Sequence, residues 1–278
     1  MAEPEKITIT LDDSYISSVC DYSVGFLRFR KGEKEEFADP IGTGTFVKLG
    51  HVYGILTAGH VFKVLDPAST VGLVRFPSVQ PPIQNRRLDL KNTDRIVDWN
   101  GKDGDAPDIA FLKIPEVDGR QIEAAGAVFY NLGIVREFKK SKPEHHKSVT
   151  HAVVGVVAEW TEQSAAEFGK GKKIVIGGLF GNALNLREFE EKGTKLVEAD
   201  ISHGPRIPGS HGGVSGGALW ELHVELDAGK KFFAVNKRLR GVAFRESADH
   251  KRVTSNDTSS IDGMIAKIRK QWPQETKD

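Results

Sequence analysis

The chain has 278 residues, of which 39% are hydrophobic, and this is enough to bury a sizeable core in one large domain or two small ones. Its 39 basic and 38 acidic residues give a formal net charge of +1, so we expect neither nucleic acid nor a membrane as a partner. No stretch approaches the roughly 18 apolar residues of a membrane-spanning helix, and the first residues lack the pattern of a signal peptide.

Short apolar runs separated by turn residues fill the first half of the chain. They predict strands at residues 23–30, 44–49, 51–57, 71–76, 94–97 and 109–114. Six such strands favour an antiparallel β-barrel over residues 1–120. Residues 121–150 contain a short predicted helix near 121–125 and a polar stretch at 139–147, and we expect them to link this barrel to a second unit.

The second half repeats the pattern, within residues 151–278. Strands are predicted at residues 151–160, 173–180, 195–201, 218–225, 232–235 and 241–244. No helical pattern long enough for βαβ units lies between them, so a parallel sheet is disfavoured. The predicted fold is therefore all-β, with two six-stranded antiparallel β-barrels.

A C-terminal α-helix completes the predicted fold. Apolar residues recur there at helical spacing, at Ile261, Met264, Ile265, Ile268 and Trp272. We expect Ser259 and Asp262 to cap the start of this helix and Pro273 to end it. The apolar stripe is expected to pack on the core.

The single cysteine, Cys20, has no second cysteine in the chain with which to form a disulfide. Because small secreted domains are often cross-linked, we expect a reducing, cytoplasmic location. Cys20 has no histidine motif beside it and is expected to be a small buried residue. His145 and His146 are adjacent but lack partners at metal-ligand spacing, so we expect no metal site.

Three short segments contain the residue types of nucleophilic catalysis. Residues 213–217, GVSGG, place the hydroxyl of Ser215 in a glycine-dense loop that can bend tightly around it. His60 follows a strand-like run, and Asp108 comes directly before another. Each has an ordinary structural explanation on its own, as a turn, a structural histidine or a turn aspartate. Together they form a series in the order His, Asp, Ser.

This order resembles the chymotrypsin-like (trypsin-like) serine peptidases. The resemblance covers most of the chain and rests on three blocks, which are GTGTFV at 42–47 leading into LTAGH at 56–60, DIAFL at 108–112, and GVSGG at 213–217. A weaker similarity lies in RGVAF at 240–244, where the family has a strand that lines the substrate cleft. The resemblance implies a serine endopeptidase that acts on protein or peptide substrates without a cofactor.

The resemblance also implies a role for each residue. His60 is expected to act as general base and then as general acid, while Asp108 holds its tautomer and stabilises the imidazolium. Ser215 is the expected nucleophile, and the backbone N–H groups of Gly213 and Ser215 would form the oxyanion hole. Because the first barrel supplies His60 and Asp108 and the second supplies Ser215, the cleft is expected between them.

The expected substrate pocket involves Gly209, Phe244 and Glu246. In the family, an Asp six residues before the nucleophile selects Arg or Lys, whereas this chain has Gly209 there. We therefore expect a preference for uncharged side chains, unless Glu246 supplies charge from the pocket wall.

Val214 stands directly before the nucleophile, where digestive members of the family have an Asp that pairs with a newly released N-terminus. A valine cannot form that pair, so we expect activity without N-terminal cleavage. Control would then act through a regulatory partner, a ligand or the glycine-rich loop at 203–212.

Two alternatives use the same residues. GVSGG also satisfies the G-x-S-x-G pattern of α/β-hydrolase esterases, but a Gly, Pro and Ser-rich loop precedes the serine in place of a buried strand. The other alternative is a catalytically inactive trypsin-like fold that serves as a protein-binding module. Its sequence mark would be the loss of a triad residue, and all three are present.

Overall fold

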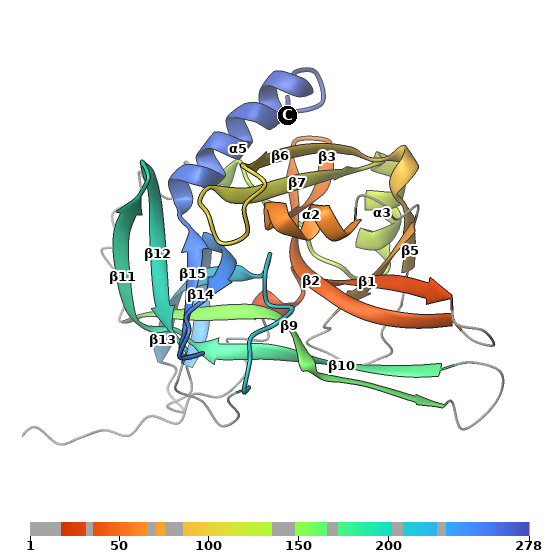
Figure 1. The fold of residues 1–278 in the computed structure, drawn as a ribbon. Coiled ribbons are helices and arrows are strands. Elements are labelled where there is room, and N and C mark those ends of the chain that lie inside the picture. The colour runs from red at the N-terminus through yellow and green to blue at the C-terminus, as the bar shows by residue number, and fades with distance from the viewer. Residues whose placement is uncertain are drawn as a thin grey trace, which may run out of the picture.

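The computed structural model describes residues 18–31, 36–65, 70–75, 86–134, 148–165, 172–201, 208–226 and 232–277. They form a mostly β protein with two antiparallel sheets and a C-terminal helix (Figure 1). This confirms the predicted β-rich, antiparallel class and the terminal helix. The polar stretch at 139–147, with His145 and His146, lies outside the described residues, as do residues 203–207 of the loop at 203–212.

The first sheet contains the strands of the N-terminal half. They are β1 (Ser23–Lys31), β2 (Glu36–Leu49), β3 (Val52–Thr57), β4 (Thr70–Arg75), β5 (Arg86–Asp89), β6 (Asp94–Trp99), β7 (Asp108–Ile114) and β8 (Tyr130–Asn131). Their order is β5-β4-β1-β2-β3-β7-β6, and the two residues of β8 pair with β2 in parallel. Within the described part of the chain, no pairing joins the edge strands β5 and β6, so closure into a barrel is not among the observed hydrogen bonds.

The second sheet contains the strands of the C-terminal half. They are β9 (Ser148–Ala165), β10 (Lys172–Asn182), β11 (Leu184–Glu191), β12 (Thr194–Asp200), β13 (Ala218–Leu226), β14 (Phe232–Glu246) and β15 (Arg252–Asn256). Their order is β10-β9-β13-β14-β15-β12-β11. In Figure 1, β9 and β10 extend as a long two-stranded arm beside β1 and β2.

The strand count differs from the expected six per half, with eight in the first sheet and seven in the second. β11 was not predicted because it lies at a sheet edge, where a strand needs few apolar side chains. β14 was predicted as two strands, but its polar middle stays paired, with Lys237 opposite Leu222 and Arg238 opposite Glu221. Pairing with a central neighbour, β13, therefore outweighs the polar composition of this segment.

The helices described over their full length include α2 (Gly59–Leu65), α3 (Glu116–Ala124) and α5 (Thr258–Gln271), with a 3₁₀ turn, η1, at Leu90–Asn92. The apolar residues predicted to face the core in α5 are all buried. The predicted cap is wrong by two residues, because the carboxylate of Asp257 accepts the Ser259 N–H at 2.7 Å and Ser259 lies inside the helix. None of the described helices is long and apolar enough to cross a membrane.

One hydrophobic core joins the two sheets. It includes Leu56 and Phe111 from the first sheet, Leu222 from the second and the buried face of α5. Trp220 is fully buried in this core, with its ring centroid 5.3 Å from that of Tyr22 and 5.2 Å from that of Tyr130. α5 contacts β6 and β7 of the first sheet as well as β12, β14 and β15 of the second, so it braces the two sheets against each other (Figure 1).

Candidate active site

His60 and Asp108 lie side by side in the first sheet. The His60 ring Nδ1 is 2.7 Å from Asp108 Oδ2, and the His60 backbone N–H donates to Asp108 Oδ1 at 2.9 Å. Asp108 is fully buried, whereas the His60 side chain is 25% exposed. One carboxylate therefore holds both the backbone and the ring of His60, and its bond to Nδ1 leaves Nε2 as the ring atom for a substrate or nucleophile.

A short helix positions His60. α2 begins at Gly59, directly after β3, and buries Val61, Phe62 and Leu65 against the sheet. No sequence pattern predicted this helix, because seven residues are too few to show a clear helical period. Gly59 is required by a close approach, since a Cβ at this position would lie 2.5 Å from Trp99 Cβ and 3.0 Å from Asp108 Oδ1.

Asn256, at the end of β15 in the second sheet, holds the backbone of Asp108. The Asp108 N–H donates to Asn256 Oδ1 at 3.2 Å, and Asn256 Nδ2 donates to the Asp108 carbonyl at 2.7 Å. Both residues are fully buried. Asn256 was not among the site residues predicted from the sequence, because a polar residue just before a helix looks like an ordinary turn residue.

Ser215 lies in the loop between β12 and β13, and its side chain is half-buried. Gly213 and Gly216 on either side have φ values of +90° and +86°, which a residue with a side chain rarely adopts. The glycine density that singled out this loop in the sequence thus has a backbone reason. Val214 is buried in an apolar cluster of the second sheet with Val153 and Leu219. The position directly before Ser215 is therefore an apolar, uncharged packing position.

Thr43 ties this loop to the first sheet. Its N–H donates to the Ser215 carbonyl at 2.8 Å, and its hydroxyl donates to the Gly213 carbonyl at 2.7 Å. The Thr43 carbonyl in turn accepts from Thr57 Oγ1 at 2.6 Å, and Thr57 is three residues before His60. These bonds bring the Ser215 loop of the second sheet against the end of β3, from which α2 and His60 continue.

The loop leaves two backbone donors free. Among the described residues, the N–H groups of Gly213 and Ser215 donate to no acceptor, whereas every other N–H from 209 to 217 does. Those others are Gly209 and Ser210 with Glu159, His211 with Glu246, Gly212 with Ser210 Oγ, Val214 with His211 O, Gly216 with Ala243 O, and Gly217 with Val214 O. The free pair is the pair expected to form an oxyanion hole.

The orientation of these two peptide groups is also held. The Gly212 carbonyl accepts from Ala158 N–H at 2.8 Å, and the Val214 carbonyl accepts from Gly217 N–H at 2.7 Å. Because C=O and N–H point in opposite directions in a trans peptide, these bonds direct the Gly213 and Ser215 N–H groups away from β9 and the following turn. Two free, oriented donors can stabilise a developing negative charge.

One expected contact is not formed. Within the described part of the chain, no hydrogen bond joins the Ser215 hydroxyl to His60. Such bonds are often long or poorly aligned in enzymes without substrate. The structure therefore brings together His60 and Asp108 by direct contact, and Ser215 with them through Thr43 and Thr57.

The three residues expected in the substrate pocket have different surroundings. Gly209 is exposed, and its N–H donates to Glu159 Oε1 at 2.8 Å. Phe244 is only 4% exposed and packs in a core cluster with Val61 and Phe62. Its ring therefore lies in the core beneath the helix of His60.

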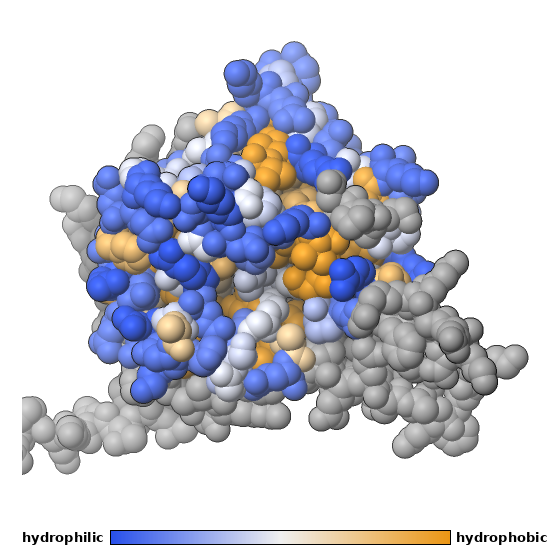
Figure 2. Space-filling view, viewed as in Figure 1, coloured by the Kyte–Doolittle hydropathy of each residue, from blue (hydrophilic) through white to orange (hydrophobic). Residues whose placement is uncertain are grey.

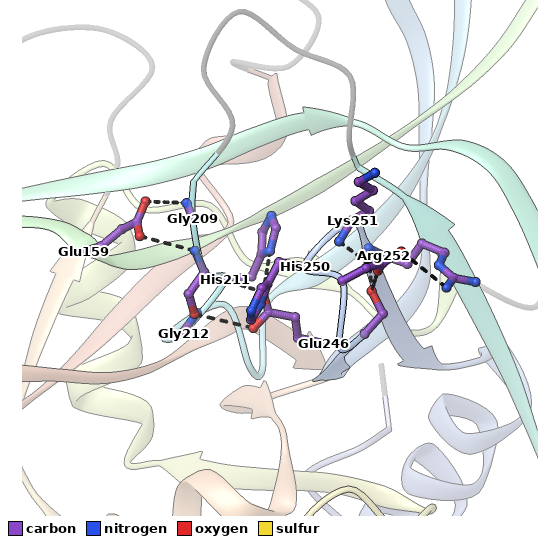
Figure 3. Close-up of polar contacts among 11 residues, drawn as sticks. Glu159, Gly209, His211, Gly212, Glu246, His250, Lys251 and Arg252 are labelled. Carbon is purple, nitrogen blue, oxygen red and sulfur yellow. Dashed lines mark hydrogen bonds and ion pairs between the residues drawn. The ribbon is translucent and has the colours of Figure 1, made fainter.

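Glu246 is engaged by two histidines (Figure 3). Its Oε1 atom is 2.8 Å from His211 Nδ1 and 2.7 Å from His250 Nδ1, and it also accepts the His211 backbone N–H at 2.9 Å. Burial raises the pKa of Glu246, but the hydrogen bonds from His211 and His250 outweigh this and keep the pKa below its usual value. Glu246 is therefore a carboxylate with its own partners. Glu159, His211 and His250 were not singled out in the sequence, because their partners are distant along the chain.

A shallow surface hollow of about 460 Å³ lies beside α2 and β6. It is lined by Gly59, Phe62, Lys63, Arg95, Val97 and Trp99. Lys63 lies 3.6 Å from Asp103 and 6.0 Å from the centre of the Trp99 ring. Figure 2 shows that this face of the molecule is mostly hydrophilic, with a group of hydrophobic residues near the position of α2.

Among the residues that the structure describes, no group of three or more His, Cys, Asp or Glu side chains could hold a metal ion. Cys20 is a buried thiol outside any disulfide, and burial raises its pKa to about 12. The site is thus built from a histidine, a carboxylate, a hydroxyl and backbone amides. No known protein-family model and no curated protein sequence matches this chain.

Proposed function

We propose that the chain is a serine endopeptidase of the chymotrypsin-like type. The observation that carries the proposal is the pair of free N–H groups at Gly213 and Ser215, in a loop that hydrogen bonds tie to the strand leading to His60. Every other N–H from 209 to 217 has an acceptor within the protein, so this pair stands out as available to an external acceptor such as a substrate oxygen. Acyl transfer needs this arrangement beside the nucleophile.

Each residue then performs one step. Ser215 Oγ attacks the carbonyl carbon of the scissile peptide bond while His60 Nε2 takes its proton, and Asp108 stabilises the imidazolium. The N–H groups of Gly213 and Ser215 stabilise the oxyanion, each contributing about 10²- to 10³-fold in kcat. His60 returns the proton to the leaving amine, and a water molecule, activated in the same way, hydrolyses the acyl-enzyme.

The two-barrel architecture is part of the proposal. Register shifts occur in the pairing of β1 with β2, β9 with β10 and β13 with β14, and such irregularities bend strands and support curvature of both sheets. We propose residues 1–120 and 151–278 as the two barrels, residues 121–150 as their link, and the cleft between them as the substrate site. The lone buried thiol of Cys20 supports the cytoplasm as the proposed location.

The test is labelling of the intact chain with a fluorophosphonate, followed by mass measurement and peptide mapping. We expect one adduct, on Ser215, in protein that keeps its N-terminal residues, together with hydrolysis of a denatured protein substrate. Ser215→Ala and His60→Ala should each abolish labelling, whereas His51→Ala should not, because His51 is an exposed histidine of the same sheet region whose ring lies beside Glu116.

Three other results would each contradict part of the proposal. Labelling with hydrolysis of esters but of no peptide would favour an esterase. Labelling only after loss of an N-terminal peptide would refute competence of the intact chain. Absence of labelling under all conditions would favour a binding module.

A further inference from the structure

Two carboxylates from different strands accept hydrogen bonds from three consecutive backbone N–H groups, at residues 209–211, which precede Ser215 in the sequence. Glu159, on β9, accepts from the Gly209 N–H at 2.8 Å and from the Ser210 N–H at 3.2 Å. Glu246, at the end of β14, accepts from the His211 N–H at 2.9 Å. Figure 3 shows the segment lying between the two carboxylates. Hydrogen bonds to a charged acceptor are stronger than neutral ones, and here the Glu246 bond is partly buried whereas the two Glu159 bonds are exposed to solvent.

Glu246 is itself fixed by its surroundings. Its Oε1 atom contacts the ring Nδ1 atoms of His211 and His250, and its Oε2 atom lies 3.5 Å from the Ser210 hydroxyl. His211 is buried, whereas His250 is exposed and has a φ of 56° in a turn that Ser247 closes. A carboxylate with this many donors around it has one favourable orientation.

The held segment leads directly to the oxyanion donors. Glu159 neighbours Ala158, whose N–H fixes the Gly212 carbonyl and thereby the orientation of the Gly213 N–H. His211 accepts the Val214 N–H through its own carbonyl at 3.0 Å. Gly212 and Gly213 would otherwise allow this backbone to rotate at modest cost, because neither carries a Cβ.

We propose that Glu159 and Glu246 are positioning residues for the oxyanion hole, a proposal that rests on the serine peptidase function. The two carboxylates hold residues 209–211 so that the peptide groups of Gly213 and Ser215 present their N–H groups to substrate. Glu246 does this by accepting the His211 N–H, while the rings of His211 and His250 orient its carboxylate. The charge of Glu246 is therefore used within the protein and not for recognition of a cationic substrate side chain.

The test compares Glu246→Ala, Glu246→Gln and Glu159→Ala in the full chain. Loss of a whole oxyanion donor costs about 10²- to 10³-fold in kcat, and a loosened donor should cost less, about 10- to 100-fold in the alanine variants. We expect KM to change less than about twofold, because ground-state binding does not use the hole. Glu246→Gln keeps an acceptor oxygen and should recover part of the lost kcat.

A second measurement separates positioning from general damage to the fold. A peptide aldehyde forms an adduct with Ser215 whose oxygen occupies the oxyanion hole, whereas the corresponding peptide alcohol forms none. In the alanine variants the inhibition constant of the aldehyde should rise in step with the fall in kcat, while that of the alcohol stays constant.

Glu221→Gln is the matched control. Glu221 is also a half-buried carboxylate of the second sheet, 3.1 Å from His223 Nε2 and 3.9 Å from His151 Nε2, and it has no contact with residues 209–217. Unchanged kcat in both alanine variants, or an equal fall in the Glu221→Gln protein, would overturn the positioning role. An inactive, unlabelled wild-type chain would instead overturn the peptidase function itself, so the two failures are distinguishable.

Discussion

Asn256 and Asp108 exchange two buried hydrogen bonds between the sheets, one from the Asp108 N–H to Asn256 Oδ1 and one from Asn256 Nδ2 to the Asp108 carbonyl. β7 and β15 are not neighbours in either sheet, so this pair joins the two halves of the protein at the base of the proposed triad. It links the position of the carboxylate that holds His60 to the packing of the second sheet.

Asn256→Ala should lower both stability and activity. The substitution leaves a buried N–H and a buried carbonyl of Asp108 without partners, which should reduce the free energy of unfolding by about 2–4 kcal/mol. A displaced Asp108 should also lower kcat by about tenfold or more. Urea denaturation and steady-state kinetics measure the two effects. Asn236→Ala, at an exposed position of β14, is the control, and an equal loss in that protein would contradict the special role of Asn256.

Asp108→Asn should lower kcat by about 10⁴-fold, because an amide in place of the carboxylate no longer holds the correct His60 tautomer. Asp103 and Asp105 are close in sequence but have other contacts, Asp103 with Lys63 and Asp105 with Lys192. Asp103→Asn and Asp105→Asn should therefore keep near-parental activity. Full activity in the Asp108→Asn protein, measured with the same peptide substrate, would remove Asp108 from the triad.

Gly216→Ala should disrupt the Ser215 loop. A Cβ at Gly216 would lie 2.0 Å from the Thr43 carbonyl oxygen and 2.1 Å from Thr57 Oγ1, and the backbone has a φ of +86°. We expect a loss of at least about 3 kcal/mol in the free energy of unfolding, or failure to fold.

The matched control for this glycine is Gly263→Ala in α5, where a Cβ would meet no atom within 4 Å. Removing a helical glycine should stabilise the protein by about 0.5–1 kcal/mol. Thermal or urea unfolding of both variants tests the pair. A Gly216→Ala protein as stable as the parent would show that the close packing of this loop against β2 and β3 is not required.

The primary pocket should prefer uncharged substrate side chains. Gly209 supplies no acid, and the carboxylate of Glu246 is occupied by His211 and His250. Burying a substrate cation without a free partner is costly, so Arg and Lys should be cleaved poorly. A peptide-library cleavage profile measures this preference, and a profile dominated by Arg and Lys would contradict it.

Local sequence patterns determined much of the strand placement and the glycine-dense Ser215 loop. Apolar runs mark strands that are buried along most of their length, such as β3 and β7, and the +90° and +86° φ values at Gly213 and Gly216 favour residues without a side chain. The helix pattern ending at Trp272 likewise follows from burial of one face. These features depend on neighbours within a few residues, so they are visible in the chain alone.

Only the tertiary structure decided how the candidate site is held. Hydrogen bonds join Asn256 to Asp108, Thr43 to Gly213 and Glu159 to Gly209, and the two residues of each pair are far apart in sequence. A local sequence pattern cannot predict such pairs. The same holds for the edge strand β11, whose partner β12 compensates for its polar composition, and for the short α2, which is stabilised by packing. Which N–H groups remain free in a loop depends on every acceptor around it, and those acceptors are assembled only when the sheets pack together.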